Sequence, residues 1–419
     1  MSIGRNLKLN ISPKIFILII IEITLFILKA KTAVEIFDFF FVFVFVLFLL
    51  DIIWLGINYL VSKKVSFRRI IPEKLVEEDE LKAKIVLDNR NFLPFFGIEV
   101  SDYLSCAEKD KERFFIFDFV KAKKSLSISY GCACNQRGKY SLGPLKVIYA
   151  SFLGFFRITT VYGLKEVLYV YPKTFRIESV PPLTRGVLPW FGLDTISASG
   201  DEDEFFGLRE YKKGDPLKRI HWFSTAKKSK LIVKEFQRCN FYQASLVFLL
   251  NQQENLGSGK KSIAEYMIKI AASLSKYFID KDICVGLLSH AGRVCSFMPN
   301  KGQEYLEEMF KFYAEAVAES HINMQEFVEE YYNLIPSNST LLVLVTEKNV
   351  NVLVEILSLR EKNISVIALV VLSSTFRSPP EKEENVRQVK ENIEARLAHI
   401  NIRSLFFQRD EPLEKEFIK

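Results

Sequence analysis

The chain has 419 residues, which is long enough for two or three domains that each bury a hydrophobic core. Apolar residues make up 49% of the sequence and charged residues 26%, and this balance excludes an intrinsically disordered protein. The formal net charge of +7 is small for this length, so it suits a protein near an anionic membrane better than a dedicated nucleic-acid binder.

Two apolar stretches near the start of the chain predict a transmembrane helical hairpin over residues 1–64. Phe39 to Val61 has the length of about 20 residues that a helix needs to cross a bilayer. Ile15 to Leu28 is shorter, but Lys14 and Lys29 at its ends can extend their ammonium groups to the membrane interfaces. A signal peptide is the competing interpretation of the first stretch, although the second stretch would still anchor the product.

The basic residues around these stretches predict the orientation of the hairpin. The segment between the stretches carries only Lys29 and Lys31, whereas the two outer flanks are richer in lysine and arginine. Because cytoplasmic flanks carry the excess of basic residues, we expect a multi-pass protein of the cell membrane whose soluble domains face the cytoplasm. The flanking residues are Arg5, Lys8, Lys14, Lys63, Lys64, Arg68 and Arg69.

Glu22 and Asp51 place one carboxylate in each predicted membrane helix. Such groups can form a proton or ion path, or they can make a polar contact between two helices or lie near an interface. Two carboxylates are too few for a transport pathway, so we expect a structural contact.

Residues 65–180 are predicted to form a β-rich, sandwich-like module. Short runs with strand character recur along this segment, and turn residues separate them. Gly138, Gly143 and Gly154 stand beside turn residues, so we expect them in tight reversals of the chain. The runs are Leu81 to Leu87, Ile98 to Leu104, Phe114 to Val120 and Ser125 to Gly131.

The six cysteines are expected to be free thiols. Cys132 and Cys134 would share one face of a strand, but no two cysteines form a CxxC pair. The four histidines are scattered along the chain. We therefore expect neither a metal nor any other cofactor.

Residues 181–240 hold the densest group of polar and aromatic residues in the chain. Gly214-Asp215-Pro216 predicts a turn followed by a helix, because aspartate caps helix N-termini and proline favours the first helical position. Ile220 is expected on one face of this helix, and Leu231 to Phe236 is predicted to be a strand.

Residues 241–419 alternate between apolar strands and amphipathic helices. This alternation predicts an α/β domain with a mostly parallel sheet that helices cover on both faces. The expected strands are Ala244 to Leu250, Ile283 to Ser289, Leu341 to Thr346, Ile364 to Leu372 and Ile402 to Phe406. The expected helices are Lys261 to Phe278, Tyr305 to Val317, Met324 to Leu334, Val350 to Leu359 and Glu381 to His399.

The segment from Phe205 to Gln237 resembles the signature of the bacterial domain of unknown function 58 family. Members of that family show Arg-Glu-Tyr, Gly-Asp and Arg-Ile-(Asp/His)-Trp in this order, followed by a strand that ends in Glu-Phe. The residues that carry the resemblance are Glu204, Phe205, Arg209, Glu210, Tyr211, Gly214, Asp215, Arg219, Ile220, His221, Trp222, Ala226, Val233, Glu235 and Phe236.

A second motif of this family is similar to residues 137–144 and 151–156, so the resemblance covers roughly residues 65 to 300. Ser151 stands where the family often has aspartate, and Phe152 where it has proline. The departure removes a charge, although the Ser151 hydroxyl can still bond to the backbone of the turn.

The C-terminal segment resembles a von Willebrand factor A domain, which often follows this signature. In such domains the first strand ends in Asp-x-Ser-x-Ser and holds a divalent cation. Here Asn251, Gln253 and Asn255 occupy the matching positions, and Glu254 is expected to point elsewhere. Because Mg²⁺ prefers carboxylate oxygens, we expect a degenerate position without a metal.

Three interpretations of the signature follow from its residues. Its charged side chains can form a structural network in which Arg209 and Arg219 pair with Glu210, Asp215 or Glu235. They can also line a binding surface. A catalytic site is the third interpretation, with His221 as the base. It lacks a nucleophile at a defined spacing, and a nucleic-acid patch is disfavoured because acidic residues interrupt the lysines and the aromatic residues resemble core positions.

These patterns predict a membrane-anchored interaction or adaptor protein that is not an enzyme. The family resemblance implies a MoxR-type AAA+ ATPase as partner, acting with the chain on an unknown client protein. Membrane lipid is the other expected partner, and nucleic acid is not expected. The alternatives are a membrane-bound hydrolase that uses the region of Arg209 and His221, and a cation-dependent adhesion module.

Overall fold

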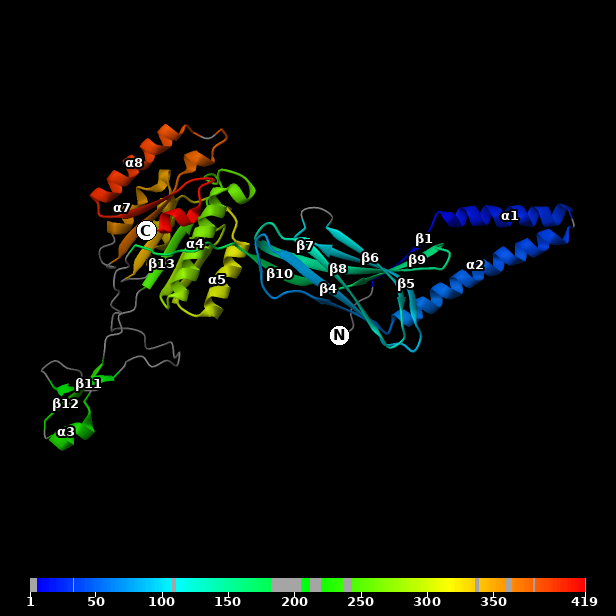
Figure 1. Cartoon of the computed structure of the whole chain (residues 1–419), viewed down its shortest axis with the longest axis horizontal. Helices are drawn as coiled ribbons and strands as arrows, with labels where there is room; N and C mark the ends of the chain where they lie inside the picture. The colour runs from blue at the N-terminus through cyan, green and yellow to red at the C-terminus, as the bar shows by residue number, and fades with distance from the viewer. Residues whose placement is uncertain are drawn as a thin grey trace. The chain divides into compact units, whose positions relative to one another are not determined.

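The chain forms two compact units in a computed structural model (Figure 1). One unit holds residues 1–173 and 310–315, and the other holds residues 174–309 and 316–419. Each unit contains hydrophobic core clusters of its own. The structure describes residues 6–32, 34–107, 111–163, 165–181, 205–211, 220–228, 230–236, 243–335, 339–358, 364–379 and 381–418.

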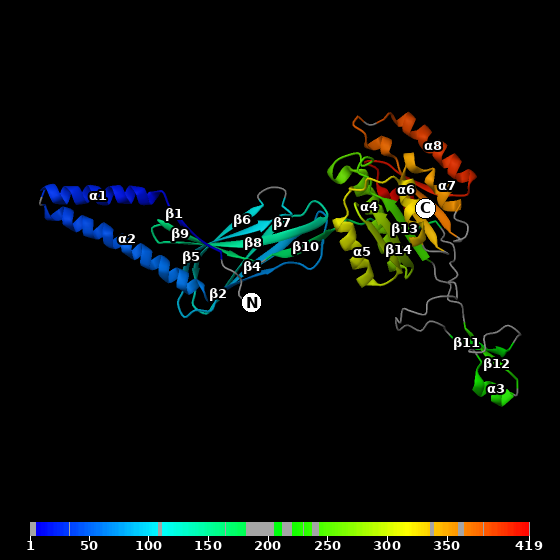
Figure 2. The same ribbon diagram turned by 180° about the vertical axis from the view of Figure 1, so that it is seen from behind.

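Two helices, α1 (Lys14–Thr32) and α2 (Glu35–Ser62), form a hairpin in the first unit and lie side by side (Figure 1, Figure 2). Near its tip, Lys29 Nζ lies 2.9 Å from Asp38 Oδ1. Of the helices that the structure describes, only α2 is long and apolar enough to cross a membrane. Glu22, Lys29 and Lys31 make α1 more charged than α2, so length and composition support one of the two predicted spans.

The rest of this unit is a β module of two sheets. Seven strands form one sheet along the path β1-β9-β8-β10-β3, with β5 joined to both β8 and β6. The second sheet has the order β2-β4-β7. The strands are β1 (Asn6–Ile11), β2 (Val65–Ile70), β3 (Leu75–Val76), β4 (Glu80–Asn89), β5 (Phe95–Leu104), β6 (Glu112–Val120), β7 (Ser125–Ala133), β8 (Gly138–Ala150), β9 (Phe156–Tyr162) and β10 (Glu166–Tyr171).

The strand register brings both ends of the helical hairpin to one end of the β module. Ile11, the last residue of β1 before the hairpin, pairs with Phe156 of β9. Val65, the first strand residue after the hairpin, pairs with Asn89 at the end of β4. The β4–β5, β6–β7 and β8–β9 loops lie at this same end, because the adjoining strand residues pair with one another. We call it the hairpin end.

Both sheets contribute to one core and to a buried ion pair. Phe67 of β2 and Tyr162 of β9 belong to the same apolar cluster, and their rings lie 4.9 Å apart. Arg69 Nε of β2 donates to Asp102 Oδ2 of β5 at 3.0 Å, and both side chains have no solvent exposure. Tyr130 of β7 donates its hydroxyl proton to the same carboxylate. The pair therefore links the two sheets inside the module.

The environment of the buried ion pair shifts the pKa values of Arg69 and Tyr130. Burial acts to lower the pKa of Arg69, but the hydrogen bond and charge of Asp102 outweigh it and leave the pKa raised. Burial and the hydrogen bond to Asp102 raise the pKa of Tyr130. Arg69 therefore stays charged, and Tyr130 stays a neutral donor, throughout the physiological pH range.

Two expectations for the β module were wrong. Gly143 lies inside strand β8 and not in a turn, whereas Gly138 is the first residue of that strand, just after the bend at Gln136. Gly143 adopts a φ of 90° where the pairing of β8 with β5 shifts register, so its conformational freedom serves a bulge. Only Gly154, with a φ of 75°, stands in a tight reversal. Strand β1 was missed, because its lysine-bearing alternation was interpreted as the basic flank of a membrane helix.

The second unit contains a six-stranded sheet in the order β15-β14-β13-β16-β17-β18. All neighbours are parallel except β14 and β15. The strands are β13 (Gln243–Leu249), β14 (Cys284–His290), β15 (Val294–Asn300), β16 (Thr340–Thr346), β17 (Ser365–Val371) and β18 (Arg403–Phe407). The helices are α4 (Ile263–Asp280), α5 (Gln303–Glu315), α6 (Met324–Tyr331), α7 (Val352–Ser358) and α8 (Glu383–His399).

Helices cover both faces of this sheet. Val247 and Leu249 of β13 share a core cluster with residues of α6, α7 and α8. Leu246 and Phe248 alternate with them, are fully buried, and therefore face the opposite side, where α4 contacts β13 and β14. The prediction of a mostly parallel sheet with two covered faces is confirmed. Strand β15 was missed because its residues are mostly half-buried or exposed.

We predict that removing one partner of the buried ion pair destabilises the protein strongly. Asp102→Ala leaves the buried Arg69 guanidinium with the longer contact of 3.5 Å to Glu166 Oε2, and loss of a buried ion pair of this kind costs about 3–5 kcal/mol. Chemical denaturation of the full-length protein in detergent would measure the loss. Glu112→Ala is the matched control, because its partly exposed pair with Lys146 is worth about 0–1 kcal/mol. Equal effects of the two substitutions would contradict the prediction.

Candidate functional site

The signature segment forms a small two-stranded sheet. Strand β11 (Phe205–Glu210) pairs antiparallel with β12 (Ile232–Phe236). Glu210 lies opposite Ile232, and Gly207 lies opposite Glu235 after a shift in register at the start of β11. Strand β12 confirms the strand that the sequence predicted there.

The described helix of the signature is α3 (Trp222–Lys228). The turn at Gly214-Asp215-Pro216 and the start of the helix predicted after it lie outside the described residues. Ile220 is not on a helix but forms an antiparallel bridge with Val233 and is 5% exposed. Its apolar side chain is therefore buried as part of the sheet.

His221 caps helix α3. Its Nδ1 atom accepts a hydrogen bond from the backbone N–H of Ser224 at 3.2 Å and lies 2.8 Å from the Ser224 hydroxyl oxygen. Ser224 is the third residue of the helix, so this is the bond that an N-cap side chain makes. An aspartate carboxylate would accept the same bond. The cap thus explains why histidine and aspartate can occupy one position of the signature.

The expected network of charges is described only in part. Glu210 Oε1 lies 3.0 Å from Lys230 Nζ, and both side chains are exposed. The backbone N–H of Tyr211, which is half-buried, donates to the carbonyl of Leu231 at 2.9 Å. The structure does not describe the other residues predicted for this network: the side chains of Arg209 and Glu235, and all of Gly214, Asp215 and Arg219.

Two aromatic side chains of the signature are exposed and not buried as expected. Trp222 is 68% exposed and Phe223 is 77% exposed, both in the first turn of α3. We call them the aromatic pair. Leu208 in β11 and Leu231, just before β12, are also exposed. The described part of the signature therefore presents apolar side chains to the solvent.

The degenerate metal position lies where the sheet of the second unit changes direction. Strands β13 and β16 are central and adjacent, and the chain runs outward from them to opposite edges. In sheets of this order, ligands bind beyond the carboxyl ends of the strands at this switch point. Asn251 follows β13 there, and Thr346 ends β16.

The side chains at the switch point bond to one another and to the backbone. Asn251 Oδ1 accepts from the N–H groups of Gln253 at 2.7 Å and Glu254 at 3.2 Å, and its Nδ2 donates to the carbonyl of Ile322 at 2.7 Å. Asn255 Oδ1 accepts from the N–H of Ala264 at 3.0 Å. Asn251 therefore stabilises a turn, and Asn255 stabilises the start of α4.

Glu254 points back into the switch point, contrary to the expectation that it would turn away. Its Oε2 atom accepts from Asn349 Nδ2 at 2.7 Å and from the Thr346 hydroxyl at 3.3 Å. Sequence reasoning missed Asn349 as a member of this site. Gln253 itself is exposed. No group of three or more metal-ligating His, Cys, Asp or Glu side chains occurs among the residues that the structure describes.

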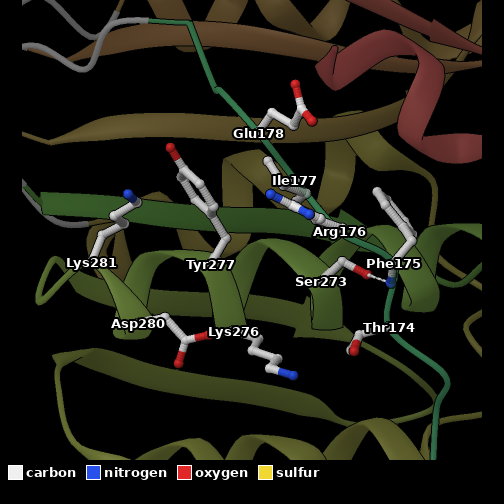
Figure 3. A pocket seen from close by; sticks show the side chains of 10 residues that line it. All are labelled: Thr174, Phe175, Arg176, Ile177, Glu178, Ser273, Lys276, Tyr277, Asp280 and Lys281. Atoms are coloured by element: carbon white, nitrogen blue, oxygen red, sulfur yellow. Dashed lines mark hydrogen bonds between the residues drawn. The ribbon is translucent and has the colours of Figure 1, made fainter.

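The second unit also has an open cleft of about 670 Å³ between residues 174–178 and helix α4 (Figure 3). The backbone N–H of Phe175 donates to Ser273 Oγ at 3.1 Å on one side of it. The charged side chains that line the cleft include both acidic and basic residues, so they favour neither an anionic nor a cationic ligand. They are Arg176, Glu178, Lys276, Asp280 and Lys281.

The two carboxylates of the hairpin do not meet each other. Asp51 is 2% exposed, and its Oδ1 accepts a hydrogen bond from the backbone N–H of Leu153 at 2.7 Å. This contact joins α2 to the β8–β9 loop and not to α1. In the same loop, Ser151 Oγ accepts from the N–H of Phe156 at 3.1 Å, as the sequence predicted. Neither oxygen of Glu22 has a hydrogen-bond partner in the described part of the chain.

The cysteines that the structure describes are free thiols. Cys106, Cys132 and Cys134 are buried in one core cluster of the β module. Burial is the main cause that raises the pKa of Cys132 to about 11, so this thiol stays protonated at neutral pH. Cys284 and Cys295 are half-buried, and Cys239 lies outside the described residues.

Comparison with known families supports the family that the signature suggested. The model described as "Protein of unknown function DUF58" matches residues 207–383. The matched range extends further toward the C-terminus than the motifs indicated, and it does not include the β module. The uncharacterized protein YeaD of Bacillus subtilis is 22% identical over 213 residues, which is 50% of this chain and 50% of that protein. The chain thus spans about half the length of this curated relative.

Solved structures with local similarity include two small domains. The CARDB domain of the PF1109 protein from Pyrococcus furiosus has a TM-score of 0.19 and 9% identity, over 25% of this chain and 91% of that domain. The C-terminal domain of wzt has a TM-score of 0.20 and 8% identity, over 26% of this chain and 73% of that domain.

We predict that aspartate replaces His221 without loss of the helix cap. His221→Ala removes the acceptor for the Ser224 N–H and destabilises the first turn of α3 by about 0.5–2 kcal/mol. Hydrogen exchange of peptides from this turn should therefore quicken by about 2- to 30-fold in His221→Ala and change little in His221→Asp. Equally rapid exchange in both variants would contradict the capping role.

We also predict that Asn251 contributes to stability. Asn251→Ala removes the acceptor for the N–H groups of Gln253 and Glu254 and the donor to the Ile322 carbonyl, at a cost of about 0.5–1.5 kcal/mol for each hydrogen bond lost. Denaturation in detergent would measure this cost against Asn385→Ala, which changes an exposed side chain of α8. A loss no larger than that of the control would show that the turn does not depend on Asn251.

Proposed function

We propose that the chain is a membrane-anchored, non-catalytic adaptor that binds a MoxR-type AAA+ ATPase and presents it with a client protein. The partner comes from the family resemblance. The anchor and the binding surface are supported by separate features of the described residues. The soluble parts face the cytoplasm, and the C-terminal unit is a von Willebrand factor A-like domain.

The attachment of the hairpin supports two membrane crossings. Strands β1 and β2 precede and follow the hairpin, and both belong to one β module. A single crossing would place these strands on opposite sides of the bilayer, which one packed module does not allow. Helix α2 is about 42 Å long and α1 about 28 Å, so each approaches or exceeds the hydrocarbon thickness of about 30 Å.

The distribution of basic residues supports the orientation. Lys14, Lys63 and Lys64 lie at the hairpin end, where the chain enters and leaves the helices. At the tip, Lys29 is paired with Asp38. An excess of lysine on the side of the β module is typical of a cytoplasmic location.

The strand order supports a von Willebrand factor A-like domain that binds a protein at its switch point. Two neighbouring central strands and an antiparallel edge strand give the sheet a single switch point. Asn251, Glu254 and Asn255 are already hydrogen-bonded within the chain. This edge of the sheet therefore lies where ligands bind in sheets of this order, while its polar side chains stabilise the fold.

The exposure of the aromatic pair is the observation that carries the proposal. Tryptophan is enriched among residues that dominate protein–protein binding energy, because its large apolar surface fills a pocket of the partner. Helix α3 holds Trp222 and Phe223 in its first turn, and His221 fixes the start of that helix. The His221 cap thus fixes the shape of α3, and the aromatic pair is exposed for contact with a partner.

We predict that Trp222→Ala with Phe223→Ala abolishes capture of the ATPase. Loss of two exposed aromatic anchors should weaken binding by about 2–4 kcal/mol, or roughly 30- to 1000-fold. Co-purification of the ATPase from detergent extracts, with and without ATP, would measure it. Phe114→Ala is the control, because Phe114 is an equally exposed aromatic residue of the β module.

The outcomes separate the parts of the proposal. Recovery of no ATPase by the unaltered protein would refute the partner. Recovery that survives the double substitution would place the binding surface elsewhere. Catalytic turnover by the purified protein that is lost in His221→Ala but kept in His221→Asp variants of equal stability would favour an enzyme.

A further inference from the structure

The loops at the hairpin end of the β module expose large apolar side chains. Phe92 and Leu93 in the β4–β5 loop are 78% and 55% exposed. Phe152 in the β8–β9 loop is 79% exposed. Exposure of this size is uncommon for phenylalanine in water, and here two such phenylalanines and an exposed leucine gather at one end of one module. This end is where the register of the strands brings both helices of the hairpin.

The apolar surface of helix α2 continues into these loops. The ring of Trp54 lies 5.6 Å from the ring of Phe96 and 6.1 Å from that of Phe152. Asp51, one turn earlier on the helix, accepts the hydrogen bond from the N–H of Leu153. Helix α2 is therefore packed against the loops. The apolar side chains of the helix and the exposed apolar side chains of the loops form one continuous surface.

The same end carries a group of exposed basic residues. Lys123 Nζ lies 4.2 Å from the centroid of the Phe92 ring, so a cation stands beside the most exposed aromatic residues. Asp88, an acidic residue at the same end, is 8% exposed and lies 2.9 Å from Arg68. The exposed basic residues of the loops and of the helix end are Lys63, Lys64, Arg90, Lys121, Lys123 and Lys124.

We propose that this end of the β module is seated in the headgroup layer of an anionic bilayer. We call the inserted residues the apolar collar: Trp54, Phe92, Leu93, Phe96, Phe152 and Leu153. Tryptophan and other aromatic side chains are favoured at the level of the headgroups, where apolar groups can lie about 5–10 Å deep. The surrounding lysines bind acidic headgroups, each contributing about 1 kcal/mol near the surface.

The inference rests on the proposed membrane anchor and goes beyond it. An anchored module could hang from its helices with its surface in water. The collar instead predicts that the module itself touches lipid. Lipid is the occupant that the residues favour over a protein partner, because the collar is continuous with the membrane helix and ringed by cations.

Quenching by brominated lipid tests the collar in the full-length protein. Nanodiscs would contain phosphatidylcholine with brominated acyl chains and phosphatidylglycerol. Phe92→Trp and Phe152→Trp each add an indole to the collar, and the parent protein supplies the background signal. Phe114→Trp is the matched control, because Phe114 is 67% exposed but lies about 20 Å along β6 from its end at Val120.

We expect the indoles added to the collar to be quenched at least about twofold more than the control indole, since only they reach the acyl boundary. We also expect Lys121→Glu, Lys123→Glu and Lys124→Glu together to abolish any increase in quenching that phosphatidylglycerol causes. Equal quenching at all three indoles would overturn the collar, as would a protein partner that covers it and leaves the indoles unquenched. Phosphatidylglycerol dependence that survives the three substitutions would overturn the role of these lysines.

The design distinguishes failure of the collar from failure of the anchor. Parent protein that resists extraction from membranes by alkaline carbonate, but shows no selective quenching, refutes the collar and leaves the anchor intact. Parent protein that carbonate extracts refutes the anchor, and the collar with it.

Discussion

The rest of the structure depends on one constraint: the helical hairpin leaves and re-enters a single β module at the same end. Strand β1 pairs with β9, and β2 pairs with β4, on either side of one shared core. A helix that crosses a bilayer between two such strands needs a second helix to return. Strand β1 ties α1 to the same β module that follows α2, although the charges of α1 make it less like a membrane span than α2.

The junction between α2 and the β module is packed rather than loose. Asp51 is buried and bonded to the backbone of the β8–β9 loop, and Asn91 Nδ2 donates to the carbonyl of Val61 at 2.8 Å near the helix end. Each bond satisfies a polar group that would otherwise be buried without a partner. These contacts limit the angle between α2 and the β module. In the proposed membrane arrangement, the depth of α2 in the bilayer therefore also fixes how far the surrounding loops lie from the membrane.

The sequence predicted regular elements well and irregular ones poorly. In the second unit, apolar strands and helices such as β16 and α4 were placed to within two residues, because burial on a whole face enforces a clear period. Strand β15 was missed because it lacks a buried face. Ile220 was expected on a helix, and local preference could not reveal that it bridges to Val233. The exposure of Trp222 was not predicted either, because most aromatic side chains are buried in folded proteins.

Polar atoms in three regions of the described chain are bonded within the fold. His221 Nδ1 accepts the bond that caps α3, Asn251 Oδ1 accepts from its own turn, and Asp51 Oδ1 accepts from the N–H of Leu153. The side chains that the same regions leave exposed are apolar, namely the aromatic pair and the collar. The two proposed binding surfaces, one for protein at the signature and one for lipid at the hairpin end, rest on this combination of internally bonded polar atoms and exposed aromatic side chains.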